Sequence, residues 1–126
     1  MILSDYFENA EGLGILATSD VSGTVDVAIY AKPYIIDENT IAFSMLDRLS
    51  YANIRSNPRA AYMFLENTEG YAGKRLYLTK VREETDSGRI KALKKKHSKI
   101  FKADEINRHL VYFAIDKIRP LVGDEM

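Results

Sequence analysis

Apolar and polar residues alternate along much of this chain with a period of two, the pattern of strands whose two faces differ. In the clearest case Val25, Val27 and Ile29 alternate with Asp26, Ala28 and Tyr30. Residues 13–36 predict a strand, a turn rich in Ser, Asp and Gly, and a second strand. A second hairpin is expected at 32–37, which continues the second strand, and 40–45. Further strands at 60–66, 74–83 and 109–116 bring the total to about six.

Three segments follow the period of a helix instead. Residues 4–10 predict a short helix, with Ser4 as N-cap and its aromatic residues on one side. Residues 47–56 predict a second helix, which Asn57 and Pro58 end. Residues 86–101 predict an amphipathic helix with lysines beside its apolar stripe. Since the connections between most strands are too short for parallel crossovers, we expect an antiparallel barrel with helices at its periphery.

Length and composition predict one globular domain, residues 1–126, because 126 residues close a single core. No apolar run is long enough for a membrane helix, and the acidic N-terminal stretch is unlike a secretory signal. A soluble, cytoplasmic protein is therefore expected. There is no Cys, so any redox chemistry must come from a bound cofactor.

Charge is unevenly distributed although the formal net charge is zero. Residues 74–102 contain eleven Lys or Arg and three acids. This basic span fits either a nucleic-acid-binding module or a solvated helix that faces an acidic body. The lysine run has no interleaved aromatic residues, which favours the solvated helix.

The start of the second helix is the best candidate for a binding site. If Asp47 caps this helix, Arg48 and Ser50 lie in its first turn, where amide groups and the helix dipole favour an anion such as phosphate. The alternative is an ordinary capped helix with a surface arginine. The two histidines, His97 and His109, have no second ligand at a suitable spacing, so no metal site is expected.

The order of these segments resembles a known family. The stretch "GILATSDVSGTVDVAIYAKPYIIDENTIAF", followed by "DRLSYANIRSNPRAAYMFL", resembles the pyridoxamine 5'-phosphate oxidase-like family of FMN-binding split β-barrels. The resemblance implies a mainly β (α+β) fold, an antiparallel six-stranded split β-barrel with two or three short peripheral helices. It also implies a homodimer with one FMN in each of two grooves between the subunits.

The same resemblance implies the residues of the cofactor site. The flavin ring is expected along Val27, Ala28, Ile29 and Tyr30, with backbone hydrogen bonds, and the predicted contacts extend to Met45, Arg48, Ser50 and Asn53, the last three at the phosphate. Family members often carry Lys, or Arg-Lys, where this chain has Leu49 and Ser50. Arg48 or a base such as the partner subunit's Arg75 would then replace that charge, and residues 119–123 would lie near the flavin of the other subunit.

The function that this implies is an FMN-dependent oxidoreductase, a flavin reductase or a pyridoxamine phosphate oxidase-like enzyme, that acts on a small molecule with an electron donor. Residues 47–59 hold few cationic anchors for pyridoxamine phosphate oxidase activity proper. No catalytic residue is predicted. The alternatives are a non-catalytic carrier of flavin, deazaflavin F420 or haem with the same fold and, less favoured, a nucleic-acid-binding module.

Overall fold

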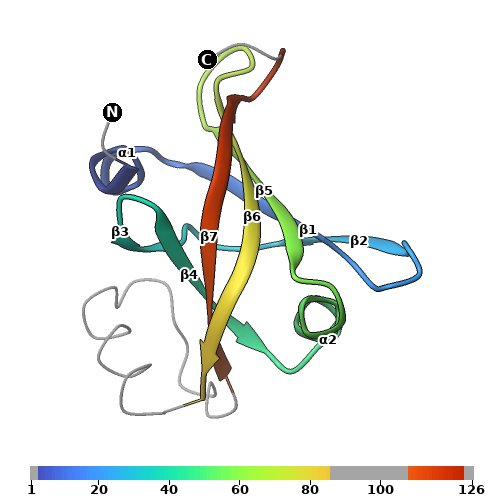
Figure 1. Cartoon of the computed structure of the whole chain (residues 1–126). Coiled ribbons are helices and arrows are strands. Elements are labelled where there is room, and N and C mark those ends of the chain that lie inside the picture. The colour runs from blue at the N-terminus through green and yellow to red at the C-terminus, as the bar shows by residue number, and fades with distance from the viewer. Residues whose placement is uncertain (1–2, 86–107, 124–126) are drawn as a thin grey trace.

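A computed structural model describes residues 3–85 and 108–123 of the chain and places all strands of these ranges in one antiparallel sheet (Figure 1). The elements are α1 (Leu3–Asn9), β1 (Gly12–Ser19), β2 (Val25–Ile29), β3 (Tyr34–Asp37), β4 (Thr40–Leu46), α2 (Leu49–Ser56), β5 (Arg59–Glu66), β6 (Gly73–Glu84) and β7 (Arg108–Pro120). In the sheet the strands lie in the order β2-β1-β5-β6-β7-β4-β3. Both predicted hairpins, β1–β2 and β3–β4, are confirmed.

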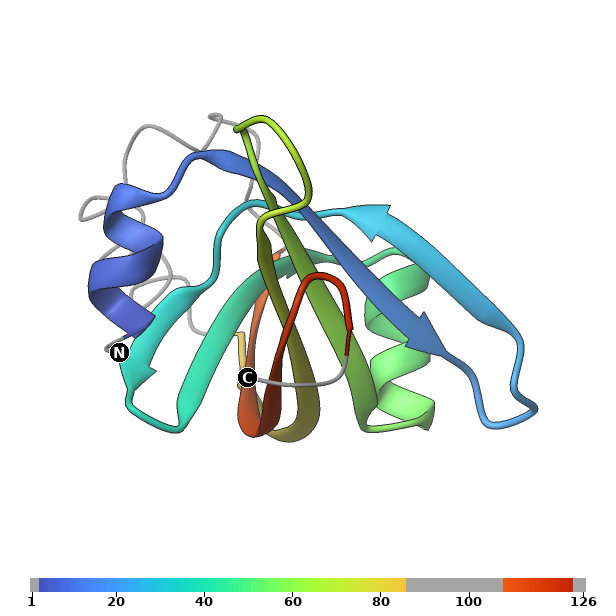
Figure 2. The same cartoon turned by 90° about the horizontal axis from the view of Figure 1, so that it is seen from above.

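The described residues contain seven strands in an open sheet, so the predicted count of six strands was wrong. The reason is the segment 30–33, which separates β2 from β3 and includes Pro33, a residue without a backbone donor. Figure 2 shows this segment carrying the chain across the sheet from β2, at one edge, to β3, at the other. We refer to residues 30–33 as the crossover.

A tyrosine of β5 attaches the crossover to the sheet. The Tyr62 hydroxyl in β5 donates to the backbone oxygens of Tyr30 (3.3 Å) and Ala31 (3.1 Å). Gly14 in β1 makes this contact possible, because a Cβ at that position would lie 1.9 Å from the Tyr62 hydroxyl oxygen. A side chain other than hydrogen at position 14 would displace both the tyrosine and the crossover.

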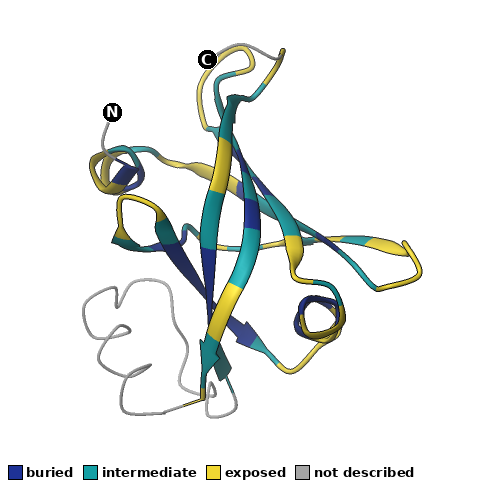
Figure 3. Ribbon diagram, in the orientation of Figure 1, coloured by how far each residue is buried: buried dark blue, intermediate teal, exposed yellow. Residues whose placement is uncertain are grey.

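The main core lies on the inner face of the sheet, where the central strands are buried (Figure 3). α1 covers part of this face with Phe7, whose ring packs edge-on against Phe64 at 5.4 Å between centroids. The predicted aromatic face of the first helix is thereby confirmed. The largest fully buried side chains are Leu16, Ile41, Met45, Ile54, Tyr62, Phe64, Leu76, Leu78, Leu110, Val111, Tyr112 and Phe113.

The opposite side of β1, β2 and β5 is also apolar, but it is not covered within the described chain. Val25, Val27 and Ile29 are 76%, 67% and 74% exposed. The predicted alternation in β2 is therefore present, yet its apolar face points outward. Strand pairing continues this face across the sheet, and we call it the outer apolar face: Leu13, Ile15, Ala17, Val25, Val27, Ile29, Ala61 and Met63.

α2 begins one residue later than predicted. Its N-cap is Arg48, in extended conformation and without a side-chain cap hydrogen bond, so the predicted cap by Asp47 was wrong. The helix ends at Ser56 before Asn57 and Pro58, as predicted. α2 packs against β1, β2 and β4.

The C-terminal part of the chain differs from the prediction in length. β7 continues to Pro120 because residues 117–120 keep pairing with the start of β6, with two register shifts along the ladder. The predicted helix at 86–101 lies outside the described residues. Within the described residues, neither helix has the length and apolar character needed to cross a membrane.

Candidate functional site

A cavity of about 350 Å³ lies where the end of β2, the crossover, β4 and the start of α2 meet. This volume falls in the range of small-molecule sites, roughly 300–1,000 Å³. We call it the β2–α2 cavity. Its lining consists of Asp26, Ala28, Ile29, Tyr30, Ala31, Lys32, Tyr34, Phe43, Ser44, Leu46, Arg48, Leu49, Ser50 and Arg108.

The backbone of β2 offers hydrogen-bonding groups beside this cavity. β2 is an edge strand that pairs only with β1 among the strands of residues 3–85 and 108–123. The Tyr30 amide donates to the Gly14 oxygen (3.0 Å), so the residues that bond to β1 are Tyr30 and, two positions earlier, Ala28. The amide and carbonyl groups of Val27 and Ile29 therefore point away from the sheet, along its edge.

This alternation separates the roles of backbone and side chain in β2. The side chain of Ala28 lines the cavity, while those of Val27 and Ile29 belong to the outer apolar face. Tyr30 contributes its side chain, since its amide is bonded to Gly14 and its carbonyl oxygen accepts from Tyr62. The backbone bonds expected from Tyr30 and Ala28 toward a ligand are thus taken up inside the sheet.

Positive charge surrounds the cavity. Three of its lining residues are bases, Lys32, Arg48 and Arg108, and one is an acid, Asp26. The Lys32 ammonium donates to the Ala10 oxygen (2.9 Å) and lies 3.8 Å from the Glu11 carboxylate, so an acid outside the cavity offsets its charge. Arg48 and Arg108 contribute the guanidinium groups of the described cavity lining.

Two hydroxyl groups, of Ser50 and Tyr30, also line the cavity. Burial raises the pKa of the Tyr30 phenol, while the Ser50 hydroxyl, as a hydrogen-bonding neighbour, and the charges of Arg108 and Arg48 lower it. Ser50 is only 6% exposed. The phenol remains protonated at neutral pH. Its ring packs edge-on against Phe43, at 5.7 Å between centroids, so its hydroxyl is a polar group on an aromatic wall.

The start of α2 forms the same end of the cavity. The first amide groups of a helix have no intrahelical acceptor, and here no N-cap side chain binds them. Arg48, Leu49 and Ser50 all line the cavity at this point. Such a helix start favours an anion, and the neighbouring guanidinium reinforces that preference.

The structure brings most, but not all, of the predicted cofactor residues to one place. Ala28, Ile29, Tyr30, Arg48 and Ser50 line the cavity, and the Val27 backbone lies on its strand edge.

Two of the predicted residues lie elsewhere. Met45 is fully buried in the main core. Asn53 is buried on the side of α2 that faces β1, where its amide donates to Thr18 Oγ1 at 3.0 Å. Asn53 therefore fixes the helix to the sheet.

Arg108 and Lys32 line the cavity but were not predicted from the sequence. Arg108 reaches the cavity because β7 pairs with β4, in a register that sets Arg108 opposite Leu46. No local pattern reveals a pairing between residues so far apart in the chain. Lys32 could have been noticed as a base next to Pro33 at the end of the first hairpin.

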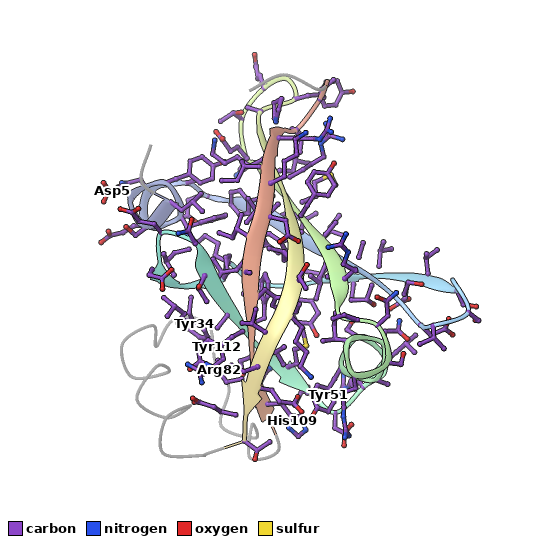
Figure 4. All side chains as sticks on the ribbon, in the orientation of Figure 1. Asp5, Tyr34, Tyr51, Arg82, His109 and Tyr112 are labelled. Carbon is purple, nitrogen blue, oxygen red and sulfur yellow. The ribbon has the colours of Figure 1, made fainter. Side chains whose placement is uncertain are left out.

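Arg75, Arg82 and the described histidine, His109, have partners of their own. Arg75 donates to the Pro120 oxygen (2.8 Å) and to the Gly123 oxygen, which holds residues 120–123 against β6. The Arg82 guanidinium lies 3.7 Å from the ring centroid of Tyr112 (Figure 4). The His109 ring stacks on Tyr51 at 3.9 Å and is not among the cavity residues.

A second cavity, of about 440 Å³, lies at the far end of β1 and β5. It has a different character, since its two charged lining residues, Glu11 and Glu66, are both acids. The Glu66 carboxylate accepts a hydrogen bond from the Tyr6 hydroxyl at 2.6 Å. An anionic ligand is therefore favoured at the β2–α2 cavity and not at this one.

Comparison with solved structures identifies the fold. An FMN-binding protein from Syntrophomonas wolfei superposes with a TM-score of 0.74 at 22% identity, covering 93% of this chain and 82% of that one. HupZ from Group A Streptococcus gives 0.75 at 19%, covering 97% and 94%. A candidate pyridoxamine 5'-phosphate oxidase from Lactobacillus delbrueckii gives 0.68 at 19%, covering 90% and 87%.

The chain has the fold of the pyridoxamine 5'-phosphate oxidase-like split β-barrels. The predicted resemblance is confirmed at this level. No protein-family model matches the sequence, and no curated protein sequence matches it. The identities of 19–22% establish the fold alone, so cofactor and activity must be argued from the cavity.

Proposed function

We propose that this protein is a homodimeric FMN-binding flavoprotein that acts as an oxidoreductase on a small substrate, with the flavin in the β2–α2 cavity. One observation carries the proposal: a single cavity joins an unpaired strand edge, an aromatic wall, and a cationic end at an uncapped helix start. These are the three chemical requirements of FMN, a flat ring with polar edges joined to a phosphate.

The strand-edge end suits the ring system. A planar heteroaromatic ring needs apolar walls and a few polar groups in its own plane. The backbone groups of Val27 and Ile29 supply donors and acceptors along the edge, while Tyr30 and Phe43 supply the wall. This division of roles supports binding of the ring through the backbone.

The α2 end suits the phosphate. The unbonded amides of the first helical turn and the Arg48 guanidinium are donors that favour a charged oxygen. The buried Ser50 hydroxyl lies at the same end of the cavity. Arg48 would take the place of the base that many relatives of this fold carry at the next two positions.

The homodimer is proposed because a single chain leaves its outer apolar face in water. Val27 and Ile29 are 67% and 74% exposed, and Leu49 beside them is 57% exposed. A contiguous exposed apolar surface of this kind marks an interaction site. Ile29 and Leu49 also line the cavity, so a second copy on this face would close the cavity and exclude water from it.

Bound FMN would supply the redox chemistry, by accepting and passing on a hydride or electrons. The residues of this chain would bind and orient it: backbone groups of β2 at the ring, and Arg48 with Ser50 at the phosphate. The Tyr30 phenol, held protonated by burial, is a fixed hydrogen-bond donor within the cavity. None of these residues is assigned a catalytic role.

The decisive experiment is FMN binding by the purified protein. The wild type should bind FMN and quench its fluorescence, and Arg48→Met should raise the Kd about 10–100-fold through loss of charge-assisted hydrogen bonds. Arg59→Met is the matched control, because Arg59 lies on β5 outside the cavity and bonds to Thr79. A wild type that cannot be loaded with FMN would refute the proposal.

A carrier without catalytic activity is the second candidate, since the described cavity places no residue that must act as an acid or a base. The two are separated by reduction of bound FMN with reduced nicotinamide, compared with free FMN. Deazaflavin F420 and haem are to be titrated in parallel.

A further inference from the structure

Two aromatic side chains from distant parts of the chain stack between α2 and β7. The Tyr51 ring, in the first turn of α2, lies parallel to the His109 imidazole near the start of β7, with 3.9 Å between centroids and an interplanar angle of 1° (Figure 4). Tyr51 is only 4% exposed. Neither residue lines the β2–α2 cavity. We call this contact the Tyr51–His109 stack.

The chain neighbours of both rings do line the cavity. Ser50 precedes Tyr51 in α2, Arg108 precedes His109 in β7, and Ser50 and Arg108 are both lining residues. The stack therefore joins α2 to β7 one residue away from each of these two cavity walls. β7 pairs with β4 and β6, so no strand ladder makes this connection.

Groups outside the cavity hold each ring in place. Burial raises the pKa of the Tyr51 phenol, and Glu83 of β6 raises it further as a hydrogen-bonding neighbour and by its charge. The Arg55 guanidinium, one turn later in α2, lies 5.6 Å from the centroid of the same ring. His109 is placed by its pairing with Met45 of β4, a fully buried residue. Both rings are thus fixed by the sheet and the helix around them.

The start of α2 is the part of the helix that depends most on such a contact. Its N-cap, Arg48, makes no side-chain cap hydrogen bond, and a missing cap destabilises a helix start. Leu49 is 57% exposed, which leaves Ser50 and Tyr51 as the buried residues of the first turn. A pair of aromatic rings stabilises a fold beyond the surface that it buries. The stack supplies this stabilisation at the turn that forms the cavity wall.

We propose that Tyr51 and His109 are positioning residues, whose stack holds the start of α2, with Ser50, at a fixed distance from the β7 wall of the cavity. They act through their chain neighbours and do not touch the ligand. The inference rests on the proposed function only where FMN serves as the probe. It requires a flat ring at position 109, because the ring orients the helix, and volume alone does not suffice.

The test is a matched pair of substitutions at one position. His109→Phe keeps a flat ring, whereas His109→Leu fills a similar volume without one. In titrations followed by flavin fluorescence, the Kd for FMN should rise about three- to tenfold in His109→Leu and stay within about twofold of the wild type in His109→Phe. Equal FMN affinity of the two variants would overturn the inference, since simple packing does not distinguish them.

A core variant separates loss of stability from loss of positioning. Phe7→Leu is the control, because Phe7 packs in the main core and is not a cavity residue. It should lower the Tm at least as much as His109→Leu and leave the Kd for FMN within about twofold. Tyr51→Leu should raise this Kd as much as His109→Leu, and the double variant should raise it no further, because both changes remove the same contact. Additive effects would show that the two rings do not act as a pair.

Amide exchange tests the positioning without a ligand. The Ala52 amide donates to the Arg48 oxygen at 3.0 Å and closes the first turn of α2, so its exchange rate reports opening of that turn. Relative to the core amides of β5, it should exchange at least about threefold faster in His109→Leu and at the wild-type rate in His109→Phe.

These two readouts separate failure of the inference from failure of the proposed function. If the wild type cannot be loaded with FMN, the flavin proposal is refuted, and faster exchange in His109→Leu still supports the positioning role. If FMN binds but neither the Kd nor the exchange rate changes in His109→Leu, the positioning role is refuted and the flavin proposal stands. Should Tyr51→Leu not fold, the two His109 variants decide the question.

Discussion

The inner and outer faces of β1 and β5 both carry apolar side chains, and the outer face continues onto β2, yet only the inner face is buried. Leu16 and Phe64 on the inner side are 0% and 1% exposed, whereas Val27 and Ile29 on the outer side remain largely in water. The same alternation of side chains therefore serves two purposes. One face forms the core of the single chain, and the other is suited to a second copy.

The position of the cavity follows from this difference. It lies at the β2 edge, where the inner face ends and the outer face begins, and it takes lining residues from both sides of that border. In the proposed dimer, a site at such a rim would be shaped by one chain and closed by the other. The four predictions below test the contrast between the two faces, beginning with the largest effect.

The largest loss is expected on the inner face. Phe64→Ala removes a ring that packs against Phe7 and Tyr6, at 5.4 and 6.1 Å between centroids. The free energy of unfolding should fall by about 3–5 kcal/mol, the usual cost of deleting a buried aromatic side chain. Met63→Ala, one position away on the outer face, should cost under about 1 kcal/mol when the protein is diluted to monomers. Urea denaturation measures both, and equal losses would contradict the assignment of faces.

On the outer face the expected loss is in association. Ile29→Asp places a carboxylate on a surface that the dimer would bury, so the dimer Kd should rise about 100-fold or more, near 2.7 kcal/mol. Analytical ultracentrifugation measures the Kd, and circular dichroism should show that the monomer remains folded. Val81→Asp, at an exposed position outside the outer apolar face, is the control. A wild type that is monomeric at all concentrations would refute the dimer.

The attachment of the crossover should contribute less. Tyr62→Phe leaves the carbonyl groups of Tyr30 and Ala31 without their hydroxyl donor, at a cost of about 1–3 kcal/mol in the free energy of unfolding. FMN affinity should fall as well, because the crossover lines the cavity. Tyr71→Phe, at an 82% exposed position, should stay within about 0.5 kcal/mol. An unchanged stability of Tyr62→Phe would show that the two bonds contribute nothing.

Alkaline pH should produce the smallest effect. Burial, with a smaller contribution from Tyr6, raises the pKa of the Tyr62 phenol above that of an unfolded tyrosine, which is about 10. The Tyr62 phenol therefore ionises at a lower pH in the unfolded chain than in the folded protein. Its contribution to the free energy of unfolding is complete below about pH 10 and declines as the pH rises further. For one such group the decline is about 0.8 kcal/mol at pH 10.5. Between pH 9 and 10.5, the free energy of unfolding from denaturation curves should fall less steeply with pH in Tyr62→Phe than in the wild type.

The local elements of this fold could be predicted because their signals are local. The alternation in residues 25–29 fixed β2, the turn residues fixed the two hairpins, and Asn57–Pro58 fixed the end of α2. The N-cap was misplaced by one residue, since an aspartate before the helix is only a preference and Arg48 takes that position without a cap bond. The helix predicted at 86–101 stays a prediction.

The candidate site was predictable only in part, because local patterns do not show which distant segments lie side by side. Arg48 and Ser50 were expected from the helix start, and Ala28 and Tyr30 from the resemblance to the family; all four line the cavity. Arg108 could not be predicted as a cavity residue, because its place depends on the pairing of β4 with β7. The periodicity of a strand shows which residues share a face, but not which strand will lie beside it.

By itself the sequence determined which segments become strands and helices, and which of their faces are apolar, because these depend on backbone geometry and neighbouring residues. The tertiary structure alone decided that β2 and β3 lie at opposite edges, that the apolar face of β2 points outward, and that Arg108 and Arg48 line one cavity. The physical reason is that sheet order and register are set by the packing of the whole chain, in which hydrogen bonds and buried surface join residues far apart in sequence.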